Sequence, residues 1–92
     1  MRIDKFLFFI RFAKSRSVAS ALVGEGRIRV DGKRVLKPSD EVRIGSIVAM
    51  PWHGEVRILE ITALPARRGP APEARTHYRE IPANVSQEND GD

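Results

Sequence analysis

The segment 27–33 constrains the fold of this chain more than any other, because it predicts a β-hairpin. Its first four residues, Arg-Ile-Arg-Val, alternate strictly, which places Ile28 and Val30 on the core face of a strand and the two arginines on the open face. Asp31-Gly32 follows directly, and both residues tolerate the positive backbone angles of a type I′ turn. The return strand therefore begins right after the turn. We expect the Asp31 carboxylate to accept hydrogen bonds from N–H groups of the turn.

Two short helices are predicted before this hairpin. Residues 3–13 repeat apolar side chains at helical spacing, and the Lys-Ser-Arg-Ser segment at 14–17 then indicates a break and a new helix start. The second helix is expected over 16–23, ended by the glycines at 24 and 26. Its buried stripe is formed by Val18, Ala19 and Leu22, with Ala21 small enough for close approach of the first helix.

Further short strands and a final helix are predicted after the hairpin. Strands are expected over 42–44, 47–50 and 56–62, with turns at Gly45-Ser46 and at 51–54, and the last strand pairs back on 47–50. Residues 65–72 predict an extended connection, followed by a short helix from Pro72 or Glu73 to about Ile81, and residues 84–92 are expected to be disordered. The predicted fold class is α+β, a helix pair packed on a small, mostly antiparallel sheet. The predicted division is one folded domain over 1–64, an Arg/Pro-rich connection with a short helix over 65–81 and a disordered acidic tail over 82–92.

Charge is distributed unevenly along the chain. Residues 1–45 contain 11 Lys/Arg against 5 Asp/Glu, whereas residues 81–92 contain none against 3. A basic surface attracts polyanions, so nucleic acid is the leading class of partner, and a merely solvated surface is the alternative. The chain has no Cys and no apolar stretch long enough for a membrane span or a signal peptide, so we expect a cytoplasmic protein without a membrane partner.

The start of the second predicted helix is the most pointed candidate for anion binding. Free N–H groups and the positive end of the helix dipole favour a phosphate there, and Lys14 and Arg16 add full charges. An ordinary Ser cap with solvated neighbours explains the same four residues. Arg27 and Arg29 have two interpretations as well. They could contact nucleic acid, or they could form only a solvated surface, as exposed arginines on a strand often do.

These residues together resemble a known RNA-binding module. The S-four domain, named after a ribosomal small-subunit protein, is similar to the run RIDKFLFFIRFAKSRSVASALVGEGRIRVDGKRVLKPS in its Arg-x-Asp-Lys opening, its basic break and its Gly-x-Ile-x-Val hairpin. The later segment RRGPAPEARTHYREI resembles the ribosome-associated heat-shock protein 15 family of bacteria. This resemblance implies a helix pair on a small sheet, of the alpha-L type, with RNA held against the helices and the hairpin.

The resemblance also implies partners and site residues. Family members associate with the large ribosomal subunit, particularly free subunits that carry a stalled nascent chain, as part of a heat-shock response. Carried over position by position, the expected RNA contacts are Arg2, Lys5, Arg11, Lys14, Ser15, Arg16, Ser17, Arg27, Arg29, Lys33, Arg34 and Lys37. Two departures stand out: Asp31 replaces the usual Asn before the hairpin glycine, and an acidic tail replaces the basic C-terminal extension of longer relatives.

Other classes of function were weighed against RNA binding. A small basic ribonuclease would need His53 and His77 to meet, and they fall in a predicted turn and on a predicted helix. A DNA-binding winged helix-turn-helix fits the element order, but the exposed face of its recognition helix would offer few long donors to base edges. The sequence therefore predicts a non-catalytic, monomeric protein that uses no cofactor and no metal.

Overall fold

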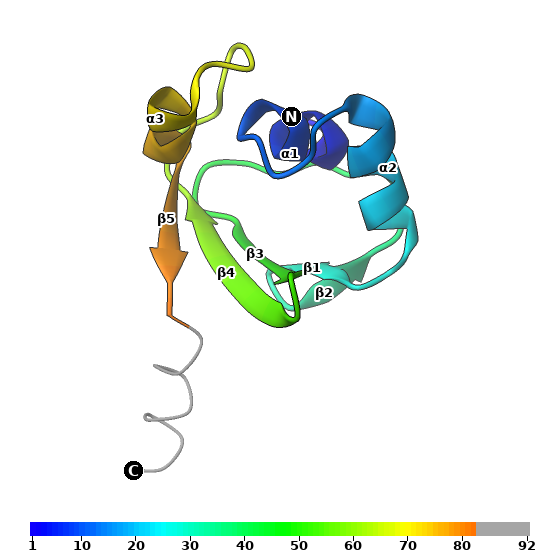
Figure 1. Cartoon of the computed structure of the whole chain (residues 1–92). Coiled ribbons are helices and arrows are strands. Elements are labelled where there is room, and N and C mark those ends of the chain that lie inside the picture. The colour runs from blue at the N-terminus through cyan, green and yellow to red at the C-terminus, as the bar shows by residue number, and fades with distance from the viewer. Residues whose placement is uncertain (83–92) are drawn as a thin grey trace, which may run out of the picture.

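The computed structural model describes residues 1–82, which form a helix pair over one face of an antiparallel sheet and a short third helix at the end of that sheet (Figure 1). The elements in chain order are α1 (Ile3–Phe9), α2 (Arg16–Gly24), β1 (Ile28–Val30), β2 (Lys33–Val35), β3 (Ile47–Trp52), β4 (Glu55–Ile61), α3 (Ala71–Ala74), the 3-10 turn η1 (Arg75–His77) and β5 (Tyr78–Ile81). The strand order is β2-β1-β3-β4-β5, and every pairing is antiparallel. Helices α1 and α2 lie together over one face of the sheet, which confirms the predicted α+β class.

The core lies between α1, α2 and the inner face of the sheet. Phe6 and Leu7 of α1 are fully buried, as are Val48 of β3 and Leu59 of β4, which stand opposite each other in the sheet. Each such side chain contributes about 1.5–3 kcal/mol of hydrophobic free energy. Within residues 1–82, no helix has the length and apolarity that crossing a bilayer requires.

Helix α1 ends four residues earlier than the sequence predicts. Arg11 has a φ of 70°, which lies in the left-handed region and stops the helix. The N–H of Arg11 donates to the carbonyl of Phe8 and the N–H of Phe12 donates to that of Leu7, which is the hydrogen-bond pattern of a Schellman motif. Glycine usually occupies this position, so the sequence lacks the ordinary stop signal and the prediction of a helix to residue 13 was wrong.

Helix α2 begins as predicted but buries a different stripe. Ala19 and Val23 are fully buried, whereas Val18 and Leu22 are only half-buried and Ala21 is exposed. The expectation that Ala21 faces the first helix was wrong, because Ala21 lies about half a turn around the helix from the buried Ala19 and Val23.

The predicted hairpin is confirmed, with β1 and β2 paired in the expected register. Asp31 and Gly32 have φ values of 53° and 84°, as a type I′ turn requires. The Asp31 carboxylate does accept a hydrogen bond, but the donor is the N–H of Ile47 at 2.9 Å, not a group of the turn. Asp31 therefore joins the hairpin to the start of β3.

Residues 42–44 do not form the predicted strand. The N–H of Val42 donates to the carbonyl of Met1 at 2.8 Å, and the amino terminus of Met1 donates back to the Val42 carbonyl at 3.2 Å. Val42 is buried, but Ile44 is 61% exposed and leads into the predicted turn at Gly45. The aliphatic pattern correctly predicted that Val42 is buried. The backbone of Val42, however, bonds to Met1 and not to a neighbouring strand.

The second half of the chain contains more sheet than predicted. Strand β3 continues through Pro51 and Trp52, so the predicted turn at 51–54 is limited to His53-Gly54. Proline is tolerated there because β1 pairs only as far as Ala49, which leaves that edge of β3 without a partner strand.

The predicted last helix is correct only as far as His77. Residues 71–77 are helical, and residues 78–81 then form β5, which pairs with β4 from Ile61 against Tyr78 to Ile58 against Ile81. Strand β4 is therefore not the last strand. The division of the chain at residue 64 stays a prediction, and the tail expected over 84–92 lies outside the described residues.

Candidate nucleic-acid interface

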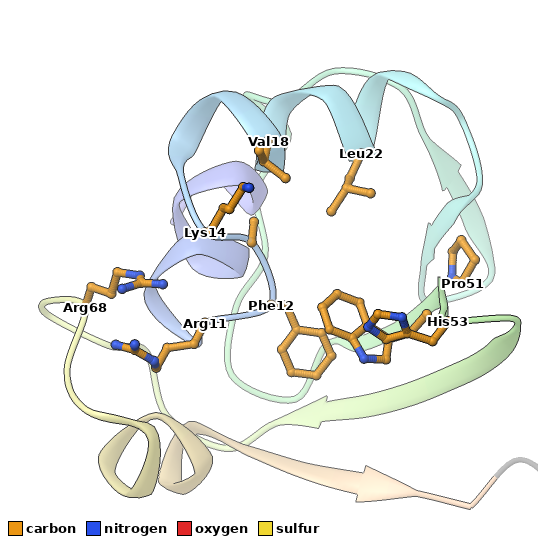
Figure 2. Close-up of a pocket in the computed structure, with 10 residues that line it drawn as sticks. Arg11, Phe12, Lys14, Val18, Leu22, Pro51, His53 and Arg68 are labelled. Carbon is orange, nitrogen blue, oxygen red and sulfur yellow. The ribbon is translucent and has the colours of Figure 1, made fainter.

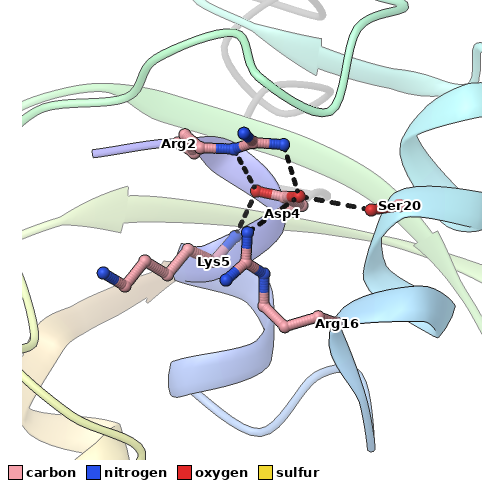
Figure 3. Close-up of polar contacts among 5 residues, drawn as sticks. All are labelled: Arg2, Asp4, Lys5, Arg16 and Ser20. Carbon is pink, nitrogen blue, oxygen red and sulfur yellow. Dashed lines mark hydrogen bonds and ion pairs between the residues drawn. The ribbon is translucent and has the colours of Figure 1, made fainter.

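A buried carboxylate organises the cations between α1 and α2. Asp4 is 1% exposed and accepts two hydrogen bonds from Arg2, at 3.1 Å from Nε and 3.0 Å from Nη2 (Figure 3). Arg16 Nη2 of α2 lies 3.3 Å from the same carboxylate, and Ser20 Oγ donates to it at 3.2 Å. The N–H of Lys5 completes the set at 2.7 Å. One carboxylate therefore holds two guanidinium groups, one from the residue before α1 and one from the start of α2.

The electrostatics of this cluster favour a negatively charged ligand. Burial alone raises the pKa of Asp4, but the hydrogen bonds from Arg2, from the Lys5 N–H and from Arg16 outweigh it, so the pKa lies below its ordinary value. One negative charge thus faces two guanidinium groups. The side chains of Arg2 and Arg16 keep 49% and 45% of their surface exposed, so both can contact an anion from solvent while Asp4 holds them in position.

The start of α2 is closed by its own cap. Ser15 Oγ accepts the N–H of Val18 at 3.1 Å, so the ordinary capping role weighed from the sequence is present. Ser17 is exposed in the first turn beside Arg16. The helix start can still contribute its remaining N–H groups and its dipole to an anion, with Arg16 as the charge next to it.

Cations of the hairpin lie side by side without an acidic partner. Arg29 stands directly opposite Arg34 in the β1–β2 register, on the sheet face turned away from the helices. No ion pair of Arg29, Lys33 or Arg34 is found within residues 1–82, and Arg29 donates only a long hydrogen bond of 3.4 Å to the Gly32 carbonyl. Like charges opposite each other are mildly destabilising, and an anion bound between them would relieve that repulsion.

The segment after β2 brings the exposed Lys37 near the helix pair. The carbonyl of Pro38 accepts the N–H of Asp4 at 3.3 Å, and that of Asp40 accepts the N–H of Ile3 at 2.7 Å. The chain therefore runs from the hairpin directly to the start of α1, where Arg2 meets Asp4.

Three predicted contacts are placed away from these two groups. Arg27 pairs with Glu25 at 2.7 Å, and Arg11 donates to the carbonyl of Gly69 at 3.0 Å. Lys14 is exposed in the segment between α1 and α2 and lines a cleft. The twelve predicted residues thus do not form a single cluster.

Two arginines of the Pro-rich connection, whose role the sequence left open, have structural partners. Arg68 donates through Nε to the Phe8 carbonyl at 3.1 Å, near the end of α1, and its guanidinium lies 4.8 Å from the centre of the Phe8 ring. Arg67 pairs with Glu73 of α3. Arg68 therefore adds a second donor to the Phe8 carbonyl, which already accepts the N–H of Arg11, and fastens the connection to α1.

The sequence analysis missed a cleft between α2 and the β3–β4 turn. Its lining includes Phe12, Trp52 and His53 together with Val18 and Leu22 of α2 (Figure 2). The available signal was the single Trp of the chain next to a His, in a basic protein with few aromatic residues, which the sequence analysis assigned only to a turn.

The two histidines weighed for a ribonuclease lie at opposite ends of β4. His53 occupies the turn before this strand, and the carbonyl of His77 accepts the N–H of Thr62 just after it. Seven residues of extended strand span roughly 20 Å. The pair cannot share one proton-transfer site in this fold.

Comparison with known proteins identifies one family over the first half of the chain. The family model of the S4 domain matches residues 1–48. The small ribosomal subunit protein uS4 of Phytoplasma mali is 43% identical over 49 residues, which cover 53% of this chain and 25% of that protein.

Longer matches extend to one group of bacterial proteins. The heat shock protein 15 homolog of Haemophilus influenzae is 33% identical over 87 residues, which cover 95% of this chain and 66% of that protein. Heat shock protein 15 of Escherichia coli K12 is 30% identical over the same length. The chain therefore spans just under two thirds of these relatives. A trimeric structure of Vibrio cholerae heat shock protein 15 superimposes with a TM-score of 0.85 at 32% identity, covering 99% of this chain and 91% of that one.

Proposed function

The chain belongs to the S4-domain family, and from this membership we propose that it binds structured RNA through the α1–α2 face and the β1–β2 hairpin. The observation that carries the proposal is the cluster in which buried Asp4 holds half-exposed Arg2 and Arg16. Guanidinium forks held in this way match the geometry of phosphate oxygens, and little side-chain freedom is lost when they bind.

The two surfaces contribute differently to binding. Arg2 and Arg16 grip the backbone at a defined position beside the start of α2, whereas Arg29, Lys33 and Arg34 neutralise phosphates along the hairpin. Contacts to phosphates position the RNA and depend on salt, and they carry little sequence information. Recognition therefore rests on the shape of a folded RNA.

The proposed partner is the ribosome, and more narrowly the RNA of the large subunit. The name of one matched relative places it in the small ribosomal subunit, and the family resemblance implies association with large subunits that carry a stalled nascent chain. The proposed role is therefore recycling of such subunits by a non-catalytic cytoplasmic protein. The monomeric state stays a prediction beside the trimeric Vibrio structure.

RNA is favoured over DNA by the exposed face of α2. After Arg16 in the first turn, the exposed positions of α2 and its C-cap are Ser17, Ala21, Gly24 and Glu25, and none of these four is a long cationic or amide side chain able to read base edges in a major groove. A recognition helix of a winged helix-turn-helix would need such donors.

A salt titration of binding to a folded ribosomal RNA fragment tests the proposal. If about six phosphates are neutralised, the log-log slope of affinity against salt is about −4 to −5. Arg16→Ala and Arg29→Ala should each lower affinity about tenfold, with an unchanged circular dichroism spectrum. Arg79→Ala is the matched control, because Arg79 lies on the outer face of β5 and pairs with Glu60. A flat titration, or equal affinities for all three variants, contradicts the proposal.

Sedimentation of the tagged protein from cell extract tests the ribosomal partner separately. Co-sedimentation with free large subunits is expected after translation is stalled. If the protein is absent from every ribosomal fraction but still binds RNA in vitro, the ribosome is excluded as the partner and RNA binding stands.

A further inference from the structure

The cleft between α2 and the β3–β4 turn has the size and lining of a ligand site. Its volume is about 470 Å³, within the roughly 300–1,000 Å³ of small-molecule sites. The Trp52 ring lies 4.9 Å from that of Phe12, tilted by 48°, and 4.8 Å from that of His53, nearly perpendicular at 84°, so the three rings form an angled aromatic wall. Val18 and Leu22 point toward this wall from α2, and both are only half-buried (Figure 2). The cleft therefore offers an apolar slot between a helix and an aromatic cluster.

Among residues 1–82, three cations and no carboxylate line this slot. Lys14 is exposed at its edge and has no ion pair within the described part of the chain. Arg11 and Arg68 donate to the carbonyls of Gly69 and Phe8, so both arginines are held in place by neutral groups that leave their charge uncompensated. A ligand that is both flat and apolar and joined to a negative group matches this combination.

From these features we infer that the cleft receives an unpaired nucleobase of the bound RNA, which packs against the rings of Trp52 and His53 while Lys14 contacts the adjoining phosphate. The inference rests on the proposed function, since it places a second contact of the same RNA. Lys14 lies two residues before Arg16, so the cleft and the Asp4 cluster lie on either side of the same helix start. An RNA backbone gripped by Arg16 could therefore place a bulged or loop nucleotide into the cleft.

Trp52 is the only tryptophan of the chain, so its fluorescence reports occupancy of the cleft directly. Three probes separate the contributions: a hexa-adenylate, the same hexamer with abasic sites, and a short RNA duplex. The hexa-adenylate should quench Trp52 and bind about tenfold more tightly than the abasic hexamer, as expected for base–aromatic stacking. The duplex should bind without quenching, because its bases are already stacked.

The variant His53→Asn removes the aromatic ring and keeps the turn. His53 has a φ of 50° before Gly54, a position where Asn is favoured, so this variant should fold normally. It should lower affinity for the hexa-adenylate about fivefold and leave affinity for the duplex within twofold. Arg79→Gln, on the outer face of β5, should change neither.

Each failure has a distinct meaning. Equal affinities for the abasic and the intact hexamer, without quenching by either, would overturn the cleft as a base site, and duplex binding would leave the proposed function intact. Absence of binding to all three probes would overturn both. A concentration-dependent change in Trp52 fluorescence without RNA would assign the cleft to a second copy of the chain and overturn the inference.

Discussion

The α1–α2 face and the β1–β2 hairpin both present arginines to solvent, yet only the first holds them with a buried acid. Asp4 orients Arg2 and Arg16 through hydrogen bonds, whereas Arg29 and Arg34 face each other with no acidic partner in the described chain. In the Asp4 cluster the guanidinium groups have fixed positions. In the hairpin the positive charges are only close together. Geometry determines where an RNA backbone is gripped, whereas charge density determines how strongly salt weakens binding.

Removing Asp4 has the largest expected effect. Its carboxylate accepts five hydrogen bonds from the described residues, so Asp4→Ala leaves two guanidinium groups and a serine hydroxyl without their partner. We expect a loss of about 2–4 kcal/mol in the free energy of unfolding, measured by urea denaturation. RNA affinity should fall as well, although the variant gains positive charge. Asp40→Ala removes an exposed acid and is the control; equal urea midpoints for the two variants would contradict the role of Asp4.

Acid should weaken the same cluster in the wild-type protein. The pKa of Asp4 is lower in the folded chain than in the unfolded chain, where it is about 3.9. The cluster therefore contributes full stability above that value and loses it as the pH falls through the folded-state pKa. The hydrogen bond from Arg57 of β4 likewise lowers the pKa of Glu80 of β5.

Unfolding free energies measured between about pH 5 and pH 2 should fall steeply for the wild type and less steeply for Asp4→Asn. Glu80→Gln should reduce the pH dependence of the unfolding free energy less than Asp4→Asn does, because Glu80 is 44% exposed and solvent screens its ion pair. If the unfolding free energy of Asp4→Asn fell with pH as steeply as that of the wild type, acid would destabilise the protein through groups other than Asp4.

The sequence predicted correctly those features that depend only on residues a few positions apart. The hairpin turn at Asp31-Gly32, the cap at Ser15 and the extent of α2 follow from side chains a few positions apart, and the structure confirms all three. The resemblance to the S-four domain and to the heat-shock protein 15 family is confirmed by the comparisons.

Long-range partners explain what the sequence did not predict. Arg11 ends α1 in a conformation usual for glycine while its side chain binds the Gly69 carbonyl, 58 residues away. Residues 78–81 carry helix-compatible side chains, but the open edge of β4 makes them a strand. The Asp4 cluster joins residues of two helices. The spacing of residues within one helix therefore could not predict it.

The smallest expected effect sharpens the contrast between the two regions. Arg34→Ala removes one of two like charges that face each other, so the free energy of unfolding should rise by about 0.2–0.5 kcal/mol. The salt slope of RNA binding should become shallower by about one unit. Arg79→Ala is the opposite test, because it breaks the cross-strand pair with Glu60 and should lower stability by a similar amount. If Arg34→Ala proved the more destabilising of the two, the arginine would act through packing of its aliphatic stem near Gly26, and the hairpin would no longer be a surface of charge alone.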